Sequence, residues 1–296
     1  MNDLLRKLAR VDFYIRWYVS QVGAGRRPSR FRGAGLEFEK ITRYDLGEDP
    51  RWINWKATAR TGAMRVLKNT LIEERQLQVF LVVDLSGSMD FGTERAPKRR
   101  VAAEIAAALA HVAWRMGDSV GYLGHASKVE DYWPPRHSPE YRLLIPAAIL
   151  GSAAGSSGSA SFSTVLERLP RKRSLLFALS DFQEDLAVLE PAVRTAARYH
   201  DLVPVIIDDP RERSLPEGTG FIQMRDLETG AHRSIWLNRK SREAWMERLS
   251  RRDEELTAVF RRAGVDAMRV NPTIDPLNEI ARLFLRRRRM APCGSG

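Results

Sequence analysis

Between residues 79 and 270, short apolar runs alternate with longer amphipathic segments. The first run, Val79 to Val83, is apolar at every position. Such a strand is typical of a sheet that is covered on both faces. Strands that alternate with helices form parallel sheets through right-handed crossovers. The sequence therefore predicts an α/β fold, with a Rossmann-like, mostly parallel sheet and helices on both faces.

The boundaries of these elements follow from glycine, proline and apolar spacing. We expect strands at residues 79–83, 119–123, 175–179, 203–207 and 265–270, and a hairpin formed by residues 221–226 and 234–237. Helices are expected from Pro97 to Gly117, over residues 186–199, before Gly264 and from about Pro276.

Two further segments precede this region. Apolar residues from Leu4 to Val22 recur every three or four positions, which predicts a helix that packs on its own domain. Residues 32–68 are rich in glycine, arginine and aromatics without a regular period, so we expect an ordered, irregular lead-in. We accordingly divide the chain into residues 1–75, a sheet domain over residues 76–288, and a flexible tail over residues 289–296.

Composition limits the compartment and the partners. Cys293 is the single cysteine, so no disulfide forms within the chain, and a reducing compartment is expected. No run reaches the ~20 apolar residues of a membrane helix, and charges lie within the first turns of the chain. These observations predict a cytoplasmic protein without a membrane span. The net charge of +11 gathers partly in arginines near both ends, which favours solvated surfaces over specific sites.

Oxygen-bearing side chains follow the first core strand directly. Asp84, Ser86 and Ser88 alternate along one turn, and Asp181 follows the strand at residues 175–179. In parallel sheets, ligands bind at the carboxyl ends of the strands, where the strand order reverses. A carboxylate and two hydroxyls suit Mg²⁺, Mn²⁺ or Ca²⁺. We expect these three residues to bind such an ion, and Asp181 to hold a metal-bound water if the two strands are neighbours.

A set of short motifs identifies a family resemblance. They are Gly35–Phe38, Arg43-Tyr44, Gly47–Asp49, Arg51–Trp55, Ala59–Gly62, the Asp84-x-Ser-x-Ser-Met run, Gly117–Gly121, Leu179–Phe182, Asp209–Glu212 and Leu215-Pro216. With these motifs the chain resembles the domain of unknown function 58 family, a branch of the von Willebrand factor A-like fold, over roughly residues 30 to 285.

The resemblance implies a function. It makes the Asp84 run the first part of a metal-ion-dependent adhesion site (MIDAS), in which an acidic side chain of a partner completes the metal's coordination. It also implies a chaperone-like adaptor that works with a MoxR-type AAA+ ATPase. We therefore expect metal-dependent protein binding without catalysis.

Two positions depart from the family pattern. Ala160 stands where the family usually has a metal-binding threonine, which leaves Ser159 and Ser161 as candidate substitutes at the rim. Asn54 stands where the family usually has an aspartate. Because Asp84 is the only certain anionic ligand, we expect the metal to bind weakly.

Two other classes of function stay open. A strand-end aspartate such as Asp84 serves some Mg²⁺-dependent phosphoryl-transfer enzymes, but these normally have a second aspartate two residues later, where this chain has Ser86. The arginine-rich ends leave nucleic-acid binding as an alternative, although no recognisable motif supports specific binding. The sequence contains no Gly-x-x-x-x-Gly-Lys loop, so an ATPase activity of the chain itself is not expected.

Overall fold

A computed structural model describes residues 36–45, 47–61, 65–73, 77–92, 96–152, 161–225, 231–272, 278–280 and 282. Contacts divide the chain into one unit of residues 21–76 and another of residues 1–20 and 77–296. We describe the two units separately. The predicted helix between Leu4 and Val22 and the predicted tail after residue 288 lie outside the described residues.

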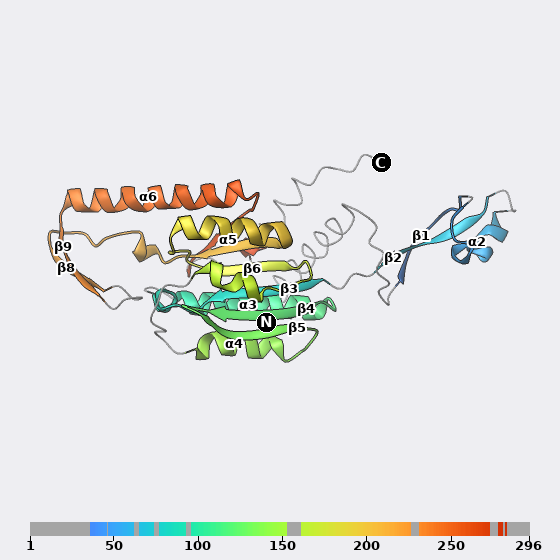
Figure 1. Ribbon diagram of the computed structural model, residues 1–296, viewed down its shortest axis with the longest axis horizontal. Helices are drawn as coiled ribbons and strands as arrows, with labels where there is room; N and C mark the ends of the chain where they lie inside the picture. The colour runs from blue at the N-terminus through green and yellow to red at the C-terminus, as the bar shows by residue number, and fades with distance from the viewer. Residues whose placement is uncertain are drawn as a thin grey trace. The chain divides into compact units, whose positions relative to one another are not determined.

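A six-stranded sheet forms the centre of the larger unit (Figure 1). In spatial order its strands are β10 (Met268–Val270), β7 (Asp201–Ile207), β6 (Leu175–Ser180), β3 (Gln78–Asp84), β4 (Ser119–His125) and β5 (Val129–Arg136). All neighbouring strands are parallel except β5, which pairs antiparallel with β4 at one edge. After β3, the next two strands in the sequence, β4 and β5, lie on one side of β3 in the sheet. The following strand, β6, lies on the opposite side of β3. The strand order therefore reverses between β3 and β6, and the predicted fold class is confirmed.

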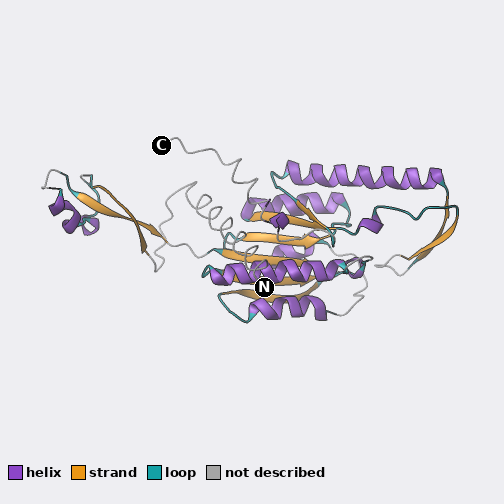
Figure 2. Ribbon diagram, turned by 180° about the vertical axis from the view of Figure 1, so that it is seen from behind, coloured by secondary structure: helices purple, strands orange, loops and turns teal. Residues whose placement is uncertain are grey.

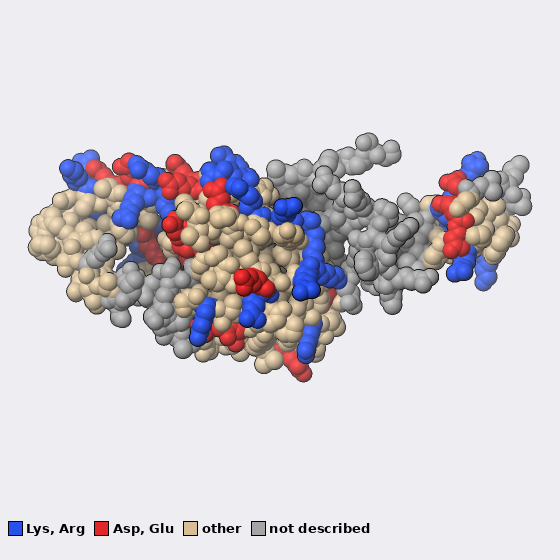
Figure 3. All heavy atoms as spheres, in the orientation of Figure 1, with Lys and Arg blue, Asp and Glu red and all other residues tan. Residues whose placement is uncertain are grey.

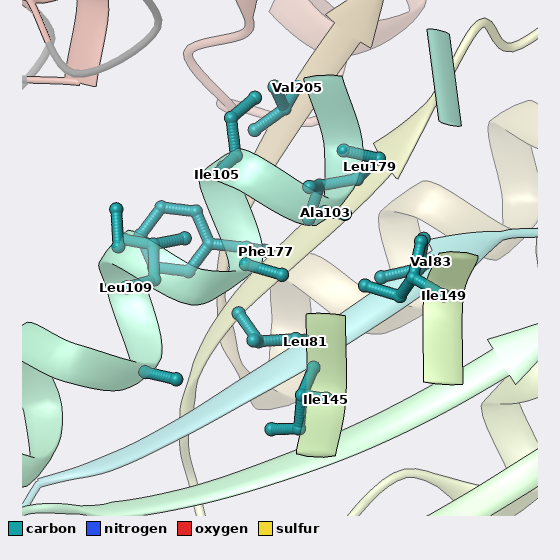
Figure 4. Packing of buried hydrophobic residues seen from close by; sticks show 14 of the residues in the cluster. Leu81, Val83, Ala103, Ile105, Leu109, Ile145, Ile149, Phe177, Leu179 and Val205 are labelled. Carbon is teal, nitrogen blue, oxygen red and sulfur yellow. The ribbon is translucent and has the colours of Figure 1, made fainter. Parts of the chain in front are cut away.

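Helices cover both faces of this sheet (Figures 1 and 2). Alternate residues of β3 divide between two cores: Leu81 packs in the core with helices α3 (Lys98–Arg115) and α4 (Tyr141–Gly151). Phe80 packs in the other core, with helices α5 (Leu186–Tyr199) and α6 (Arg239–Arg262). Figure 4 shows the first core, where strand side chains meet those of α3 and α4. Burial on both faces explains why the run from Val79 to Val83 is uniformly apolar.

The packing is close enough to require glycine at residues 121 and 124 of β4. A Cβ atom added to Gly121 would lie 2.5 Å from Phe80 Cδ2 and 2.9 Å from Pro135 Cγ. We expect Gly121→Ala to lower the free energy of unfolding by about 1–3 kcal/mol, since overpacking forces the surrounding side chains to shift. Urea denaturation measures this loss. Gly151→Ala is the matched control, because nothing lies within 4 Å of its added Cβ. Equal stability of the two variants would contradict the close packing.

The smaller unit contains more regular structure than its sequence predicts. β1 (Leu36–Arg43) and β2 (Leu67–Glu73) form an antiparallel pair, joined by a 3-10 turn, η1 (Pro50–Trp52), and a short helix, α2 (Trp55–Arg60). Asn54 caps α2, because its Oδ1 accepts a hydrogen bond from the Ala57 amide at 2.9 Å. Its Nδ2 donates to Asn69 Oδ1 at 2.7 Å, which ties the cap to β2. The residue that departs from the family pattern thus has a local structural role.

A second hairpin precedes the longest of the described helices in the sequence. It consists of β8 (Gly220–Arg225) and β9 (His232–Leu237), close to the predicted boundaries. Helix α6 follows directly and is capped by Asn238, whose side chain accepts from the Ser241 amide. On the face shown in Figure 3, basic and acidic side chains interleave along α6. Ion pairs one helical turn apart, such as Arg239–Glu243 and Arg251–Glu247, lie along this helix. This visible face of α6 therefore lacks the continuous basic stripe typical of nucleic-acid sites.

Candidate functional site

The candidate site lies where the strand order reverses. β3 and β6 are parallel neighbours, with Val83 opposite Leu179 in the register. The residues that follow, Asp84 and Ser180, therefore meet at one edge of the sheet. Ser180 Oγ donates a hydrogen bond to Asp84 Oδ2 at 2.7 Å. The two predicted strand ends are thus joined directly by Ser180, which is not among the predicted metal ligands.

Asp84 is buried, with 3% of its surface exposed. Its other carboxylate oxygen, Oδ1, accepts a hydrogen bond from the Ser86 amide at 2.8 Å. Burial raises the pKa of Asp84, and the nearby charge of Asp181 raises it further, whereas His125 and the hydrogen bonds from Ser180 and Ser86 act in the opposite direction. This carboxyl group is held in a fixed position close to a second acidic group.

Ser86 and Ser88 bring their hydroxyls together. Ser86 has an extended backbone and precedes a 3-10 turn, η2 (Gly87–Asp90). The two Oγ atoms lie 3.1 Å apart. Ser86 is buried and Ser88 is half-buried, so the second hydroxyl is the more accessible of the two. The alternate spacing thus places two hydroxyls side by side, next to the backbone amide that binds Asp84.

Asp181 has a partner that its sequence position did not indicate. The buried ammonium of Lys98, on α3, donates to Asp181 Oδ2 at 2.8 Å and to Glu212 Oε1 at 2.6 Å. Burial alone would lower the pKa of Lys98, but the two carboxylates outweigh it and raise that pKa. Its place after a neighbouring strand predicts that Asp181 holds a metal-bound water, whereas in the structure this carboxylate pairs with Lys98.

A further carboxylate near Asp84 comes from Glu184, which the sequence motifs do not indicate. Its oxygens accept hydrogen bonds from Ser161 Oγ at 2.8 Å and from the Phe162 amide at 2.9 Å. Ser161, a predicted rim residue, begins the turn η3 (Phe162–Arg168). Burial raises the pKa of Glu184. Ser159 and Ala160, the other rim positions considered, lie outside the described residues.

The loop after β6 is fixed by α6. Phe182 adopts a φ of 51°, in the left-handed region that costs a bulky residue energy. Arg252 of α6 donates to the carbonyl oxygens of Phe182, at 2.9 Å, and of Glu184. The ring of Phe182 packs edge-to-face on Phe260, with centroids 5.3 Å apart. These contacts hold the loop that places Asp181 and Glu184.

A small cavity connects these groups. Asp84, Asp181 and Glu184 all line it, together with His125 at the end of β4. His125 is buried, and burial lowers the pKa of its ring. The cavity is therefore acidic and is bounded by a histidine whose neutral form is favoured.

The donor set fits a weakly held divalent cation. Asp84, Ser86 and Ser88 supply one carboxylate and two hydroxyls, which are hard oxygen donors suited to Mg²⁺ or Mn²⁺. Within the described ranges, no group of three or more His, Cys, Asp and Glu side chains is arranged to hold a metal. Asp181 does not fit as a further ligand while Lys98 engages it. The fit therefore extends to the first three residues only.

Sequence comparison supplies the family. The family described as "Protein of unknown function DUF58" matches residues 40–255. The chain belongs to the DUF58 family. This assignment confirms the resemblance drawn from the motifs. Two relatives are the uncharacterized proteins Mb1516 of Mycobacterium bovis and Rv1480 of Mycobacterium tuberculosis. Each is 29% identical over 266 residues, which cover 88% of this DUF58 chain and 83% of the relative.

Several solved structures are similar to this DUF58 protein. Conserved hypothetical protein BatB of Bacteroides thetaiotaomicron is 14% identical, with a TM-score of 0.48, over 72% of this chain and 99% of BatB. A von Willebrand factor type A protein of Catenulispora acidiphila is 13% identical, with a TM-score of 0.38, over 76% of this chain and 44% of that protein. Both TM-scores lie below 0.5, and it is the strand order of the sheet that establishes the fold.

The comparisons overturn the prediction of a cytoplasmic protein. A protein of Bacteroides fragilis (15% identity, 71% of this chain, 97% of that chain, TM-score 0.46) is described as an aerotolerance-related membrane protein. A protein of Vibrio fischeri is described as an uncharacterized membrane spanning protein. It is 16% identical, with a TM-score of 0.26, over 74% of this chain and 100% of that chain. The prediction rested on composition and on charges near the N-terminus, which do not determine location. In the part of the chain that is described, no helix combines the length and apolarity needed to cross a bilayer.

Proposed function

We propose that this DUF58 protein is a non-catalytic protein-binding module that holds an acidic side chain of its partner through a divalent cation. Asp84, Ser86 and Ser88 would bind the ion. The observation that carries the proposal is the convergence of the two serine hydroxyls, 3.1 Å apart, beside a buried carboxylate at the reversal of strand order. This edge of a parallel sheet is where such folds bind ligands.

The charge balance supports an acidic partner. One carboxylate and two neutral hydroxyls leave a divalent ion with net positive charge, and hard cations of this type take six or more oxygen ligands. The ion would therefore keep positions for water and for one carboxylate from another protein. Buried Asp84 would hold the ion from within, while half-buried Ser88 lies nearer the surface from which a partner approaches.

The partner that the family resemblance suggests is a MoxR-type AAA+ ATPase, with this protein as a chaperone-like adaptor. Co-purification of the full chain with a MoxR-type ATPase from the same genome tests this pairing. Retention that requires Mg²⁺ and is lost in chelator supports it. Retention that is unchanged in chelator would show that the two proteins bind each other without the metal ion, which would contradict the metal-dependent mechanism.

The metal site itself is tested by thermal unfolding. Because few charges hold the ion, we expect a Kd high enough that millimolar Mg²⁺ only approaches it. Mg²⁺ at its Kd stabilises the protein by ~0.4 kcal/mol, a Tm increase of about 1 °C. Asp84→Ala should abolish this increase, and partner binding with it. Ser180→Ala is the matched control, since it removes a hydrogen bond from Asp84 but leaves the carboxylate. If Asp84→Ala in excess chelator binds its partner as tightly as the wild type does with Mg²⁺ present, the metal-dependent mechanism fails.

A further inference from the structure

Lys98 occupies an unfavourable place for a cation. It is the first residue of α3, an 18-residue helix whose N-terminal end carries partial positive charge. It is also fully buried, and burial of a charged ammonium is costly unless the charge is paired. A lysine in this position therefore requires strong compensation from nearby acids.

Asp181 and Glu212 provide that compensation. One oxygen of each carboxylate lies within hydrogen-bonding distance of the single Nζ atom, at 2.8 and 2.6 Å. The acids come from different places in the fold: Asp181 follows β6, and Glu212 lies in the turn η4 (Pro210–Glu212) after β7. Two acidic oxygens thus converge on one point, as they would around a small metal ion.

We propose that Lys98 is a resident cation that keeps Asp181 and Glu212 from binding a divalent ion, and thereby sets the metal affinity of the site low. The inference rests on the proposed function for the location of the metal at Asp84. It assigns Lys98 a positioning role, because Lys98 acts through the carboxylates and not as a ligand.

The arrangement of the acids explains how this control works. Asp181 lines one cavity with Asp84 and a second cavity with Glu212, so it links the two other acids; Arg213, Arg252 and Arg269 also line the second cavity. With Lys98 in place, the charges of Asp181 and Glu212 are engaged, so Asp84 and Glu184 are the carboxylates of the first cavity that an incoming ion meets without a lysine partner. A positive ammonium beside the site also repels a divalent ion. Without Lys98, Asp181 and Glu212 would lose their paired cation and could also attract the ion.

The test measures Mn²⁺ binding by isothermal titration calorimetry, with the full chain and its Lys98→Met variant. Methionine keeps the length of the side chain and removes its charge. We expect the Kd for Mn²⁺ to fall at least about tenfold in Lys98→Met. A triple variant that also carries Asp181→Asn and Glu212→Gln should return to the weak affinity of the wild type.

Two further measurements keep the outcome clear if Lys98→Met is poorly folded. If Lys98→Met is poorly folded, circular dichroism during Mn²⁺ titration should show that the ion restores the secondary structure of this variant. The Lys98→Met, Glu212→Gln variant, with one unpaired acid fewer, should bind with intermediate affinity. If neither variant binds Mn²⁺ more tightly than the wild type, or if the triple variant binds as tightly as Lys98→Met, the inference is wrong. Tight binding by Lys98→Met with none by the wild type would instead refute the proposed function alone.

Discussion

Lys98→Met is expected to lower the free energy of unfolding by about 3–5 kcal/mol, because removing one member of a buried ion pair leaves the other charges without compensation. Asp181, which is 5% exposed, would lose its bond to Lys98, and Glu212 would lose the same donor. Such a loss is a large part of the 5–15 kcal/mol that typically stabilises a domain. Urea denaturation in chelator, fitted by linear extrapolation, measures it.

Lys128→Met is the control for this variant, because Lys128 is exposed on the turn between β4 and β5. Its effect should stay within about 0.5 kcal/mol. Adding Asp181→Asn and Glu212→Gln to Lys98→Met should recover part of the lost stability, since neutral amides cost less to bury than unpaired carboxylates. A loss below ~1 kcal/mol in Lys98→Met would show that the ion pair is not a strong structural element.

Phe177→Ala should be comparably destabilising through a different mechanism. Phe177 lies in β6, is fully buried, and packs in the core with Leu109 of α3 (Figure 4). Truncation removes apolar contacts and leaves a cavity, which costs about 3–5 kcal/mol. The same denaturation experiment measures the change.

Phe221→Ala provides the comparison for Phe177→Ala. Phe221 is 78% exposed, and it packs edge-to-face on Trp236 with centroids 4.7 Å apart. Losing that pair should cost about 0.5–1.5 kcal/mol. If the two alanine variants were equally stable, the core between the sheet and α3 would not have the close packing described here.

The central strands could be predicted because burial on both faces leaves a plain signal. β3, β6 and β7 are apolar almost throughout, and the predicted helix at residues 186–199 has the same boundaries as α5. β5 and α4 were missed for a physical reason. In β5 the apolar residues do not alternate with polar ones and two prolines are present, and α4 is apolar at every position from Leu143 to Leu150, with Pro146 in its interior. Both segments depart from the patterns that identify strands and helices.

The candidate site could be predicted only where its residues are close in sequence. Asp84, Ser86 and Ser88 lie within five positions, so their spacing alone indicates convergence. Lys98 meets Asp181 and Glu212 across 83 and 114 residues, a relation that no local pattern encodes. A lysine at the start of a helix is ordinary in a sequence. Only the fold shows that this one is buried between acids.

The two edges of the central sheet also limit how a partner can bind. At one edge, Pro134 and Pro135 interrupt β5 and lack amide hydrogens, and its register with β4 is irregular. At the other edge, β10 is only three residues long. Both are features that prevent another chain from extending a sheet. Recognition by strand addition is therefore disfavoured at either edge of the described sheet.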